Sequence, residues 1–114
     1  MDLYSLSGNV ADFKRTELLD IVAIRPKSIV DRYGEGNGCN LEETTRWYAF
    51  KRGPLVFSVF DLRKYRDHGA AYPHGFWASS SLCAICIGSA IPVATADVEE
   101  FVEWLVTQTK EIWL

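Results

Sequence analysis

The residues with the most reactive side chains in this sequence include two cysteines at a suggestive spacing. Cys83 and Cys86 match the C-x-x-C pattern of redox dithiols and of some zinc sites. They lie in an apolar run, residues 82–87, that predicts a β-strand, and residues three apart in a strand point to opposite faces. We therefore expect two separated, reduced thiols, no metal site and no other cofactor.

A second group of reactive side chains contains the two histidines of the chain. His68 and His74, together with Asp67 and the distant Cys39, are residue types that could build a nucleophilic site. Nothing around them resembles a nucleophile elbow, and none of their spacings matches a zinc finger. We therefore predict a protein that is not an enzyme, and we keep a small enzyme using these residues as an alternative.

Positive charge is concentrated in one part of an otherwise acidic chain, whose net charge is −3. Residues 46–66 contain a single acid, Asp61, which we interpret as a surface acid paired with Arg46 or Arg63. Unless these charges are simply the solvated ends of a hairpin, such a basic face favours an anionic partner, either an acidic protein surface or a nucleic acid. The basic residues of this segment are Arg46, Lys51, Arg52, Arg63, Lys64 and Arg66.

The segment 63–80 has no regular periodicity and mixes aromatic with basic residues. Long irregular segments in small domains are often functional, and Tyr, Trp and Arg dominate binding hot spots. We expect Phe76–Trp77 to fold back onto the core. Tyr65, Arg66 and Tyr72 should be exposed. The predicted binding residues are Arg46, Lys51, Arg52, Arg63, Lys64, Tyr65, Arg66, His68, Tyr72, His74 and Trp77.

Three helices are predicted around these residues. The first covers 10–23, with Asn9 as its N-cap, because apolar residues recur largely on one face. The second covers 26–34, since proline suits the first helical position and glycine suits the C′ position. The third covers 95–113, capped by Thr95, with acids in the first turn where the helix dipole favours them.

Three strands are predicted between the second and third helices. Residues 44–51 and 55–62 form a hairpin, and residues 82–87 form the third strand. On the second strand we expect Phe57 and Val59 to face the core. The order α-α-β-β-β-α predicts an α+β fold, with a small three-stranded antiparallel sheet covered by two N-terminal helices and one long C-terminal helix.

Length and composition limit the function classes. The 114 residues predict one domain over 1–114, and no apolar run is long enough to cross a membrane. The start lacks signal-peptide features, so we expect a cytoplasmic protein. Trp104 lies off the apolar stripe of the last helix, which suggests a homodimer as an option.

We predict a protein-binding module of the inhibitor, adaptor or immunity type. The alternatives are a nucleic-acid-binding domain using 46–66 and the enzyme described above.

Overall fold

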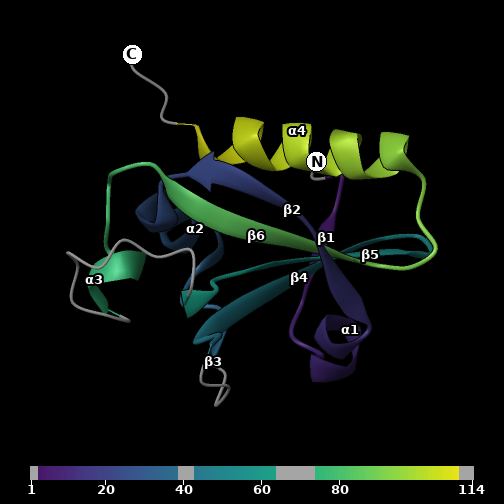
Figure 1. The fold of residues 1–114 in the computed structure, drawn as a ribbon, viewed down its shortest axis with the longest axis horizontal. Coiled ribbons are helices and arrows are strands. Elements are labelled where there is room, and N and C mark those ends of the chain that lie inside the picture. Colours follow the sequence, from purple (N-terminus) through teal and green to yellow (C-terminus); the bar gives the residue numbers. More distant parts are fainter. Residues whose placement is uncertain (1–2, 39–42, 64–73, 111–114) are drawn as a thin grey trace.

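The computed structural model describes residues 3–38, 43–63 and 74–110. Figure 1 shows a long helix lying across a twisted antiparallel sheet. In chain order the elements are β1 (Ser5–Ser7), α1 (Val10–Lys14), β2 (Thr16–Ile24), α2 (Pro26–Tyr33), β3 (Asn37–Gly38), β4 (Arg46–Arg52), β5 (Leu55–Phe60), α3 (His74–Trp77), β6 (Cys83–Ala90) and α4 (Thr95–Thr109).

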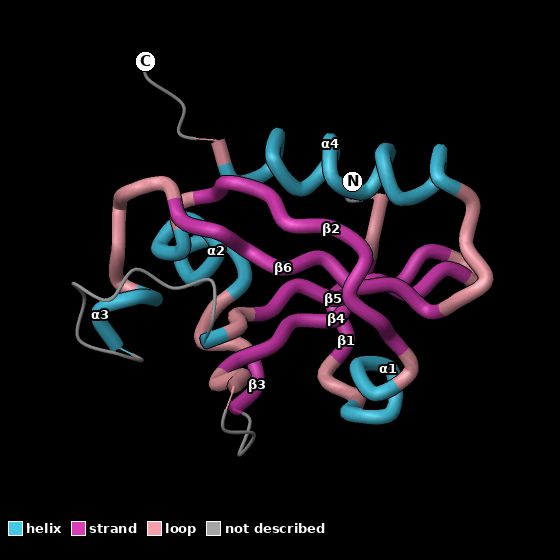
Figure 2. Tube along the Cα trace, in the orientation of Figure 1, coloured by secondary structure: helices cyan, strands magenta, loops and turns pink. Residues whose placement is uncertain are grey.

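The sheet of the described residues has six strands in the order β1-β4-β5-β6-β2, with β3 beside β4. All pairings are antiparallel, and Figure 2 shows the strands side by side beneath α4. The prediction of a three-stranded sheet under two N-terminal helices is therefore wrong. The α+β class, the β4–β5 hairpin and the long C-terminal helix are confirmed. Gly53 turns the hairpin with a φ of 55°, which glycine adopts readily.

The largest error concerns residues 10–23, which we predicted as one helix. Asn9 caps a helix there as predicted, but α1 ends at Lys14, where the hydroxyl of Thr16 donates to the carbonyl of Phe13 at 2.6 Å. The chain then enters β2, whose four β-branched residues favour a strand. β2 pairs along its length with β6, so backbone pairing with a distant segment overrides the local helical pattern.

The main core lies between the sheet and the helices α2, α3 and α4. Its centre is aromatic: the rings of Phe57 and Phe101 stack in parallel at a centroid distance of 4.4 Å, and Tyr4 meets Phe101 edge to face at 5.1 Å. Trp104 is also buried here, which removes the reason for expecting it to form a dimer interface. The cap of α4 is Ala94, without a side-chain hydrogen bond, and not Thr95 as predicted.

The opposite face of the sheet carries a smaller core beneath α1. Phe13 stacks on Trp47 at 4.8 Å and meets Phe60 edge to face. Because both faces are covered here, Phe60 and its neighbours on β5 are buried as well as the predicted Phe57 and Val59. A central strand covered on both sides has no solvent-facing set of residues.

The two cysteines of β6 follow the strand geometry. Cys83 packs against the main core, whereas Cys86 is buried in the smaller core on the other face. Cys83 is a free thiol. The predicted separation of the two sulfur atoms is therefore confirmed.

In the described part of the chain, no helix combines the length and the apolar character needed to cross a bilayer.

Candidate functional site

Strand geometry disperses the basic residues of the predicted binding segment. Arg46 and Arg52 lie at opposite ends of β4, roughly 20 Å apart at the rise of an extended strand. Lys51 pairs with Val56, on the face of the sheet opposite to Arg52. Arg63 is exposed and anchored through its backbone N–H to the carbonyl of Glu43 at 2.8 Å. The basic residues of this segment that the structure describes therefore do not form one face.

Three of these cations are also engaged by acids from other elements. Arg52 pairs with Glu100 of α4 at 2.6 Å. Lys51 lies 3.7 Å from the buried carboxylate of Asp12. The third pair joins Arg46 and Glu35 and is described below. Each pair lowers the local positive charge that an anionic partner would meet.

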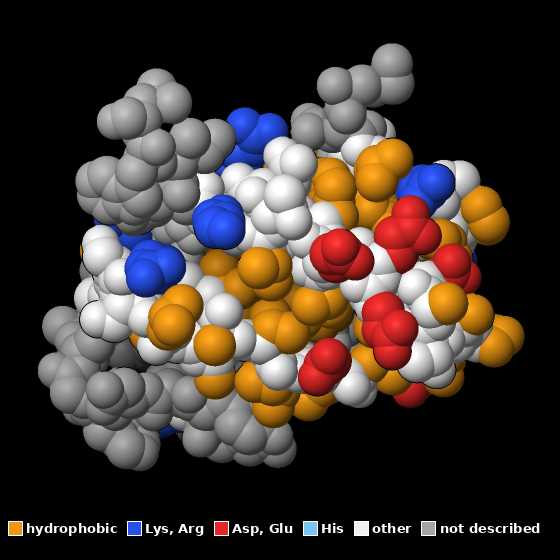
Figure 3. All heavy atoms as spheres, turned by 90° about the horizontal axis from the view of Figure 1, so that it is seen from above, with side chains coloured by type: hydrophobic (Ala, Val, Ile, Leu, Met, Phe, Trp, Pro, Cys, Tyr) orange, Lys and Arg blue, Asp and Glu red, His pale blue; other side chains and the backbone are white. Residues whose placement is uncertain are grey.

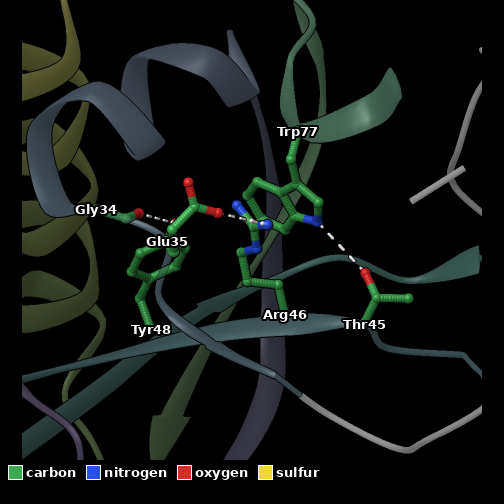
Figure 4. Close-up of polar contacts among 6 residues, drawn as sticks. All are labelled: Gly34, Glu35, Thr45, Arg46, Tyr48 and Trp77. Carbon is green, nitrogen blue, oxygen red and sulfur yellow. Dashed lines mark hydrogen bonds and ion pairs between the residues drawn. The ribbon is translucent and has the colours of Figure 1, made fainter. Parts of the chain in front are cut away.

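Arg46 stands in a small polar cluster at one end of the sheet, shown in Figure 4. Its guanidinium carbon lies 5.1 Å from the ring centroid of Trp77, and its Nη2 atom lies 3.2 Å from a carboxylate oxygen of Glu35. The Trp77 indole donates to the hydroxyl of Thr45 at 3.4 Å. Phe76 and Trp77 are both buried, as predicted. The cluster holds α3 against β4, so Trp77 offers little surface to a partner.

Asp61 is a fully buried residue, which corrects its interpretation as a surface acid. Its carboxylate accepts the backbone N–H groups of Thr45 and Arg46 at 2.9 and 3.0 Å, and the Thr45 hydroxyl at 2.8 Å. It therefore contacts the backbone of Arg46, whereas the Arg46 side chain turns to Glu35. Asp61 ties the start of β4 to the end of β5.

Tyr48 provides a test of this end of the fold. Its hydroxyl donates to the carbonyl of Gly34 at 2.7 Å, and burial raises the pKa of Tyr48 against the opposing effect of Arg46. A raised pKa keeps the folded state protonated after the unfolded chain has lost its proton, so stability should be complete below about pH 10 and fall above it. Tyr48→Phe should cost about 1 kcal/mol at pH 7 and flatten that alkaline decline. Urea titrations from pH 7 to 11 measure both effects, and an equal decline of stability with pH in the two proteins would contradict the assignment.

Several predicted residues lie outside the residues that the structure describes. These are Cys39, Lys64, Tyr65, Arg66, Asp67, His68 and Tyr72. His74 begins α3, but its side chain is likewise outside the description. Their roles in binding or catalysis remain predictions. Among the described residues, no group of three or more His, Cys, Asp or Glu side chains could hold a metal ion.

The sequence analysis missed a second surface, an apolar hollow between β2 and the start of α4. It has a volume of about 490 Å³ and is lined by side chains of β2, the β6–α4 connection and the first turns of α4. Leu19 and Ile91 are 44% and 53% exposed, which is high for large apolar side chains. Its lining residues are Leu19, Asp20, Ile91, Pro92, Val93, Thr95, Val98 and Glu99.

The strand beside this hollow is an open edge. β2 pairs with β6 on one side and ends the described sheet on the other. Its pairing is interrupted by a bulge between Leu18 and Asp20, and the Asp20 carboxylate accepts the N–H of Ile21 at 2.8 Å. Bulges and edge acids discourage strand addition by another chain. The exposed side chains of β2, rather than its backbone, are therefore what it presents to a partner.

The surroundings of the hollow are acidic. α4 contains four acids and no Lys or Arg, and Asp20 and Glu99 stand on the rim itself. In Figure 3, which views the molecule from the α4 side, the visible acidic side chains gather on the right among apolar ones. This arrangement can seat an apolar side chain and attract cations around it.

Comparisons of the sequence with protein-family models and with curated proteins find no match.

Proposed function

We propose that this protein is a non-enzymatic binding module of the inhibitor or immunity type. It binds a basic partner protein at the hollow between β2 and α4. The observation that carries this proposal is the pair of exposed apolar side chains, Leu19 and Ile91, beside the acids Asp20 and Glu99. Exposed apolar surface rimmed by polar groups is typical of protein interaction sites. We refer to these four residues as the acidic groove.

The sign of the partner's charge is the reverse of the one predicted from residues 46–66. Those cations that the structure describes are dispersed, and three of them are paired with acids. The acids that line the groove, Asp20 and Glu99, instead favour Lys or Arg on the partner, whereas Glu100 already pairs with Arg52. A cytoplasmic setting stays part of this proposal, since the positions of Cys83 and Cys86 on opposite faces of β6 do not suit a disulfide between them.

Selection from a display library of random peptides tests the proposal directly. Peptides that bind the immobilised full chain should combine a large apolar residue with Lys or Arg. Their affinity should fall with added salt, because screening weakens attraction between exposed charges. The proposal would be contradicted if the selected peptides are rich in Asp and Glu, or if no peptide is selected.

Point variants locate the site. Leu19→Ser and Ile91→Ser should each lower the affinity for the selected peptides about tenfold, since each removes roughly 1–2 kcal/mol of apolar burial. Asp20→Asn should weaken binding chiefly at low salt and make the affinity less dependent on salt, because it removes one of the charges that attract the partner. Val106→Ser is the matched control, because Val106 is equally exposed on α4 but does not line the groove.

Three outcomes would overturn this assignment. Loss of binding in the double variant Tyr65→Ala/Arg66→Ala, with the groove variants unaffected, would return the site to the segment predicted from the sequence. Tight, salt-sensitive binding of a single-stranded oligonucleotide would favour the nucleic-acid alternative. A dimer in light scattering that Leu19→Ser dissociates would make a second copy of this chain the occupant.

A further inference from the structure

The sheet face opposite α4 is covered by a described helix over only part of its width. Helices α2, α3 and α4 contribute side chains to the main core, whereas α1 contributes Phe13 to the smaller core on the opposite face. Phe13 contacts Trp47 of β4 and Phe60 of β5. In Figure 2, α1 lies near the start of β2, away from the C-terminal end of that strand. The described helices therefore leave the β2 and β6 part of this face uncovered.

The strand register identifies the side chains on the uncovered part. Cys86 belongs to the smaller core, and residues paired across an antiparallel ladder share a face, so its partner Ile21 lies on the same side. The Ala23–Ala84 and Leu18–Gly88 pairs lie on this side too, because side chains alternate with a period of two and Ala84 and Gly88 flank Cys86 at that spacing. We call these six residues the β2–β6 patch.

The composition of the β2–β6 patch is unusual for a face in contact with water. None of its six residues is charged, and Leu18 and Ile21 are 39% and 38% exposed. An antiparallel strand with one solvated face normally alternates apolar with polar residues. β2 instead places both of its acids, Glu17 and Asp20, on the α4 side. The sequence of β2 therefore suits a strand that is covered on both faces.

Charge favours a second copy of this chain as the cover. Each copy has a net charge of −3, and acids line the α4 side of β2, so two copies that met there would repel each other. The β2–β6 patch brings no like charges together. It also contains no acid that would attract a basic partner.

The shape of the β2–β6 patch also suits contact with an identical surface. A twofold symmetric contact requires a surface that is complementary to itself. The large side chain of Ile21 lies beside the small pair Ala23 and Ala84. A twofold axis near these residues would place Ile21 of each copy over the two alanines of the other.

We propose that this protein forms a weak homodimer in which the β2–β6 patches of two copies pack face to face. The bulge in β2 and the carboxylate of Asp20 disfavour pairing of the two β2 edges. The two sheets therefore stack at a distance of about 10 Å instead of joining into one sheet. Because the patch is small, the association is in the range of weak and transient interfaces.

The proposed dimer leaves the acidic groove free. The groove is lined by residues of α4, which covers the face of the sheet opposite to the β2–β6 patch. The dimer would therefore present two acidic grooves, which raises the avidity for a partner with two basic sites. This consequence rests on the proposed function, whereas the dimer itself does not.

Sedimentation equilibrium of the full chain tests the dimer. We expect a reversible equilibrium between monomer and dimer, with a dissociation constant between about 10 µM and about 1 mM. Added salt should lower this constant, because screening weakens the repulsion between two copies of net charge −3. Peptide binding at the acidic groove is expected to weaken with salt, so the two proposals can fail independently.

Substitutions of Ile21 locate the contact. Ile21→Lys should raise the dissociation constant of the dimer about a hundredfold, because a symmetric contact contains the change twice, at about tenfold each. Ile21→Thr keeps a β-branched side chain, which suits a strand, and should raise the constant about tenfold. Leu19→Lys is the matched control, since Leu19 is 44% exposed on the same strand but lines the acidic groove. It should leave the dissociation constant unchanged.

Circular dichroism of dilute samples shows whether each variant is folded, and Ile21→Thr serves if Ile21→Lys is not. A chain that stays monomeric up to about 1 mM would overturn the proposal. Dissociation of the dimer by added salt would do the same. So would a dimer that Leu19→Lys dissociates and the folded Ile21 variants do not, because the two copies would then meet at the acidic groove.

Discussion

Replacing Asp61 with alanine should lower the free energy of unfolding by about 3–5 kcal/mol. The variant removes the acceptor for the backbone N–H groups of Thr45 and Arg46 and for the Thr45 hydroxyl. Asp61 is fully buried, so water cannot replace the lost carboxylate without a rearrangement. A loss of this size would take a large share of the stability of a small domain.

Two further substitutions make the Asp61 result interpretable. Asp61→Asn keeps one acceptor oxygen and should cost less than Asp61→Ala. Asp31→Ala removes an exposed acid whose pairing with Lys27 spans one helical turn, and it should cost less than about 0.5 kcal/mol. Urea unfolding at neutral pH measures all three variants. A cost below about 1 kcal/mol for Asp61→Ala would mean that these hydrogen bonds do not hold the start of β4.

The parts of the fold that the sequence predicted correctly are those with local signals. Pro26 and Gly34 bracket α2, and Gly34 has a φ of 84° as expected at its C-cap. The hairpin follows from two apolar runs separated by a short turn at Gly53. The opposite positions of Cys83 and Cys86 follow from the two-residue period of a strand.

The parts that the sequence did not predict depend on pairing between distant segments. β2 carries apolar residues that also fit a helical face, and its partner β6 begins about sixty residues later, so no local window contains the information that decides between them. β1 and β3 have only three and two residues, too few for a periodic signal. Three strands, β1, β2 and β3, were therefore missing from the predicted sheet. One of them, β2, forms an edge of the described sheet.

The candidate sites were missed for a related reason. A count of charged residues along 46–66 does not reveal that Arg52 pairs with Glu100, which lies 48 residues away in the sequence. The acidic groove is assembled from separate segments that meet only in the fold, and the first turns of α4 form one of its sides. The attachment of α4 to the sheet therefore supports this proposed site.

Phe101→Ala should be the most damaging substitution in α4, with a loss of about 3–5 kcal/mol in the free energy of unfolding. Phe101 is fully buried, stacks on Phe57 at 4.4 Å and meets Tyr4 edge to face. Alanine would leave a cavity beneath the helix and remove ring contacts that contribute beyond burial alone. Urea unfolding followed by tryptophan fluorescence measures the loss, because Trp104 lies 5.9 Å from the Phe101 ring.

The matched control for Phe101→Ala is Val106→Ala on the exposed side of the same helix, which should change stability by less than about 0.5 kcal/mol. Phe101→Leu fills most of the space but lacks a ring, so it separates cavity formation from aromatic stacking. If Phe101→Ala costs no more than Val106→Ala, α4 is not anchored through its aromatic face. If Phe101→Ala keeps a native spectrum at low temperature, peptide binding at the acidic groove can be measured in this variant. A loss of peptide binding in the folded variant would show that the groove depends on the position of α4 on the sheet.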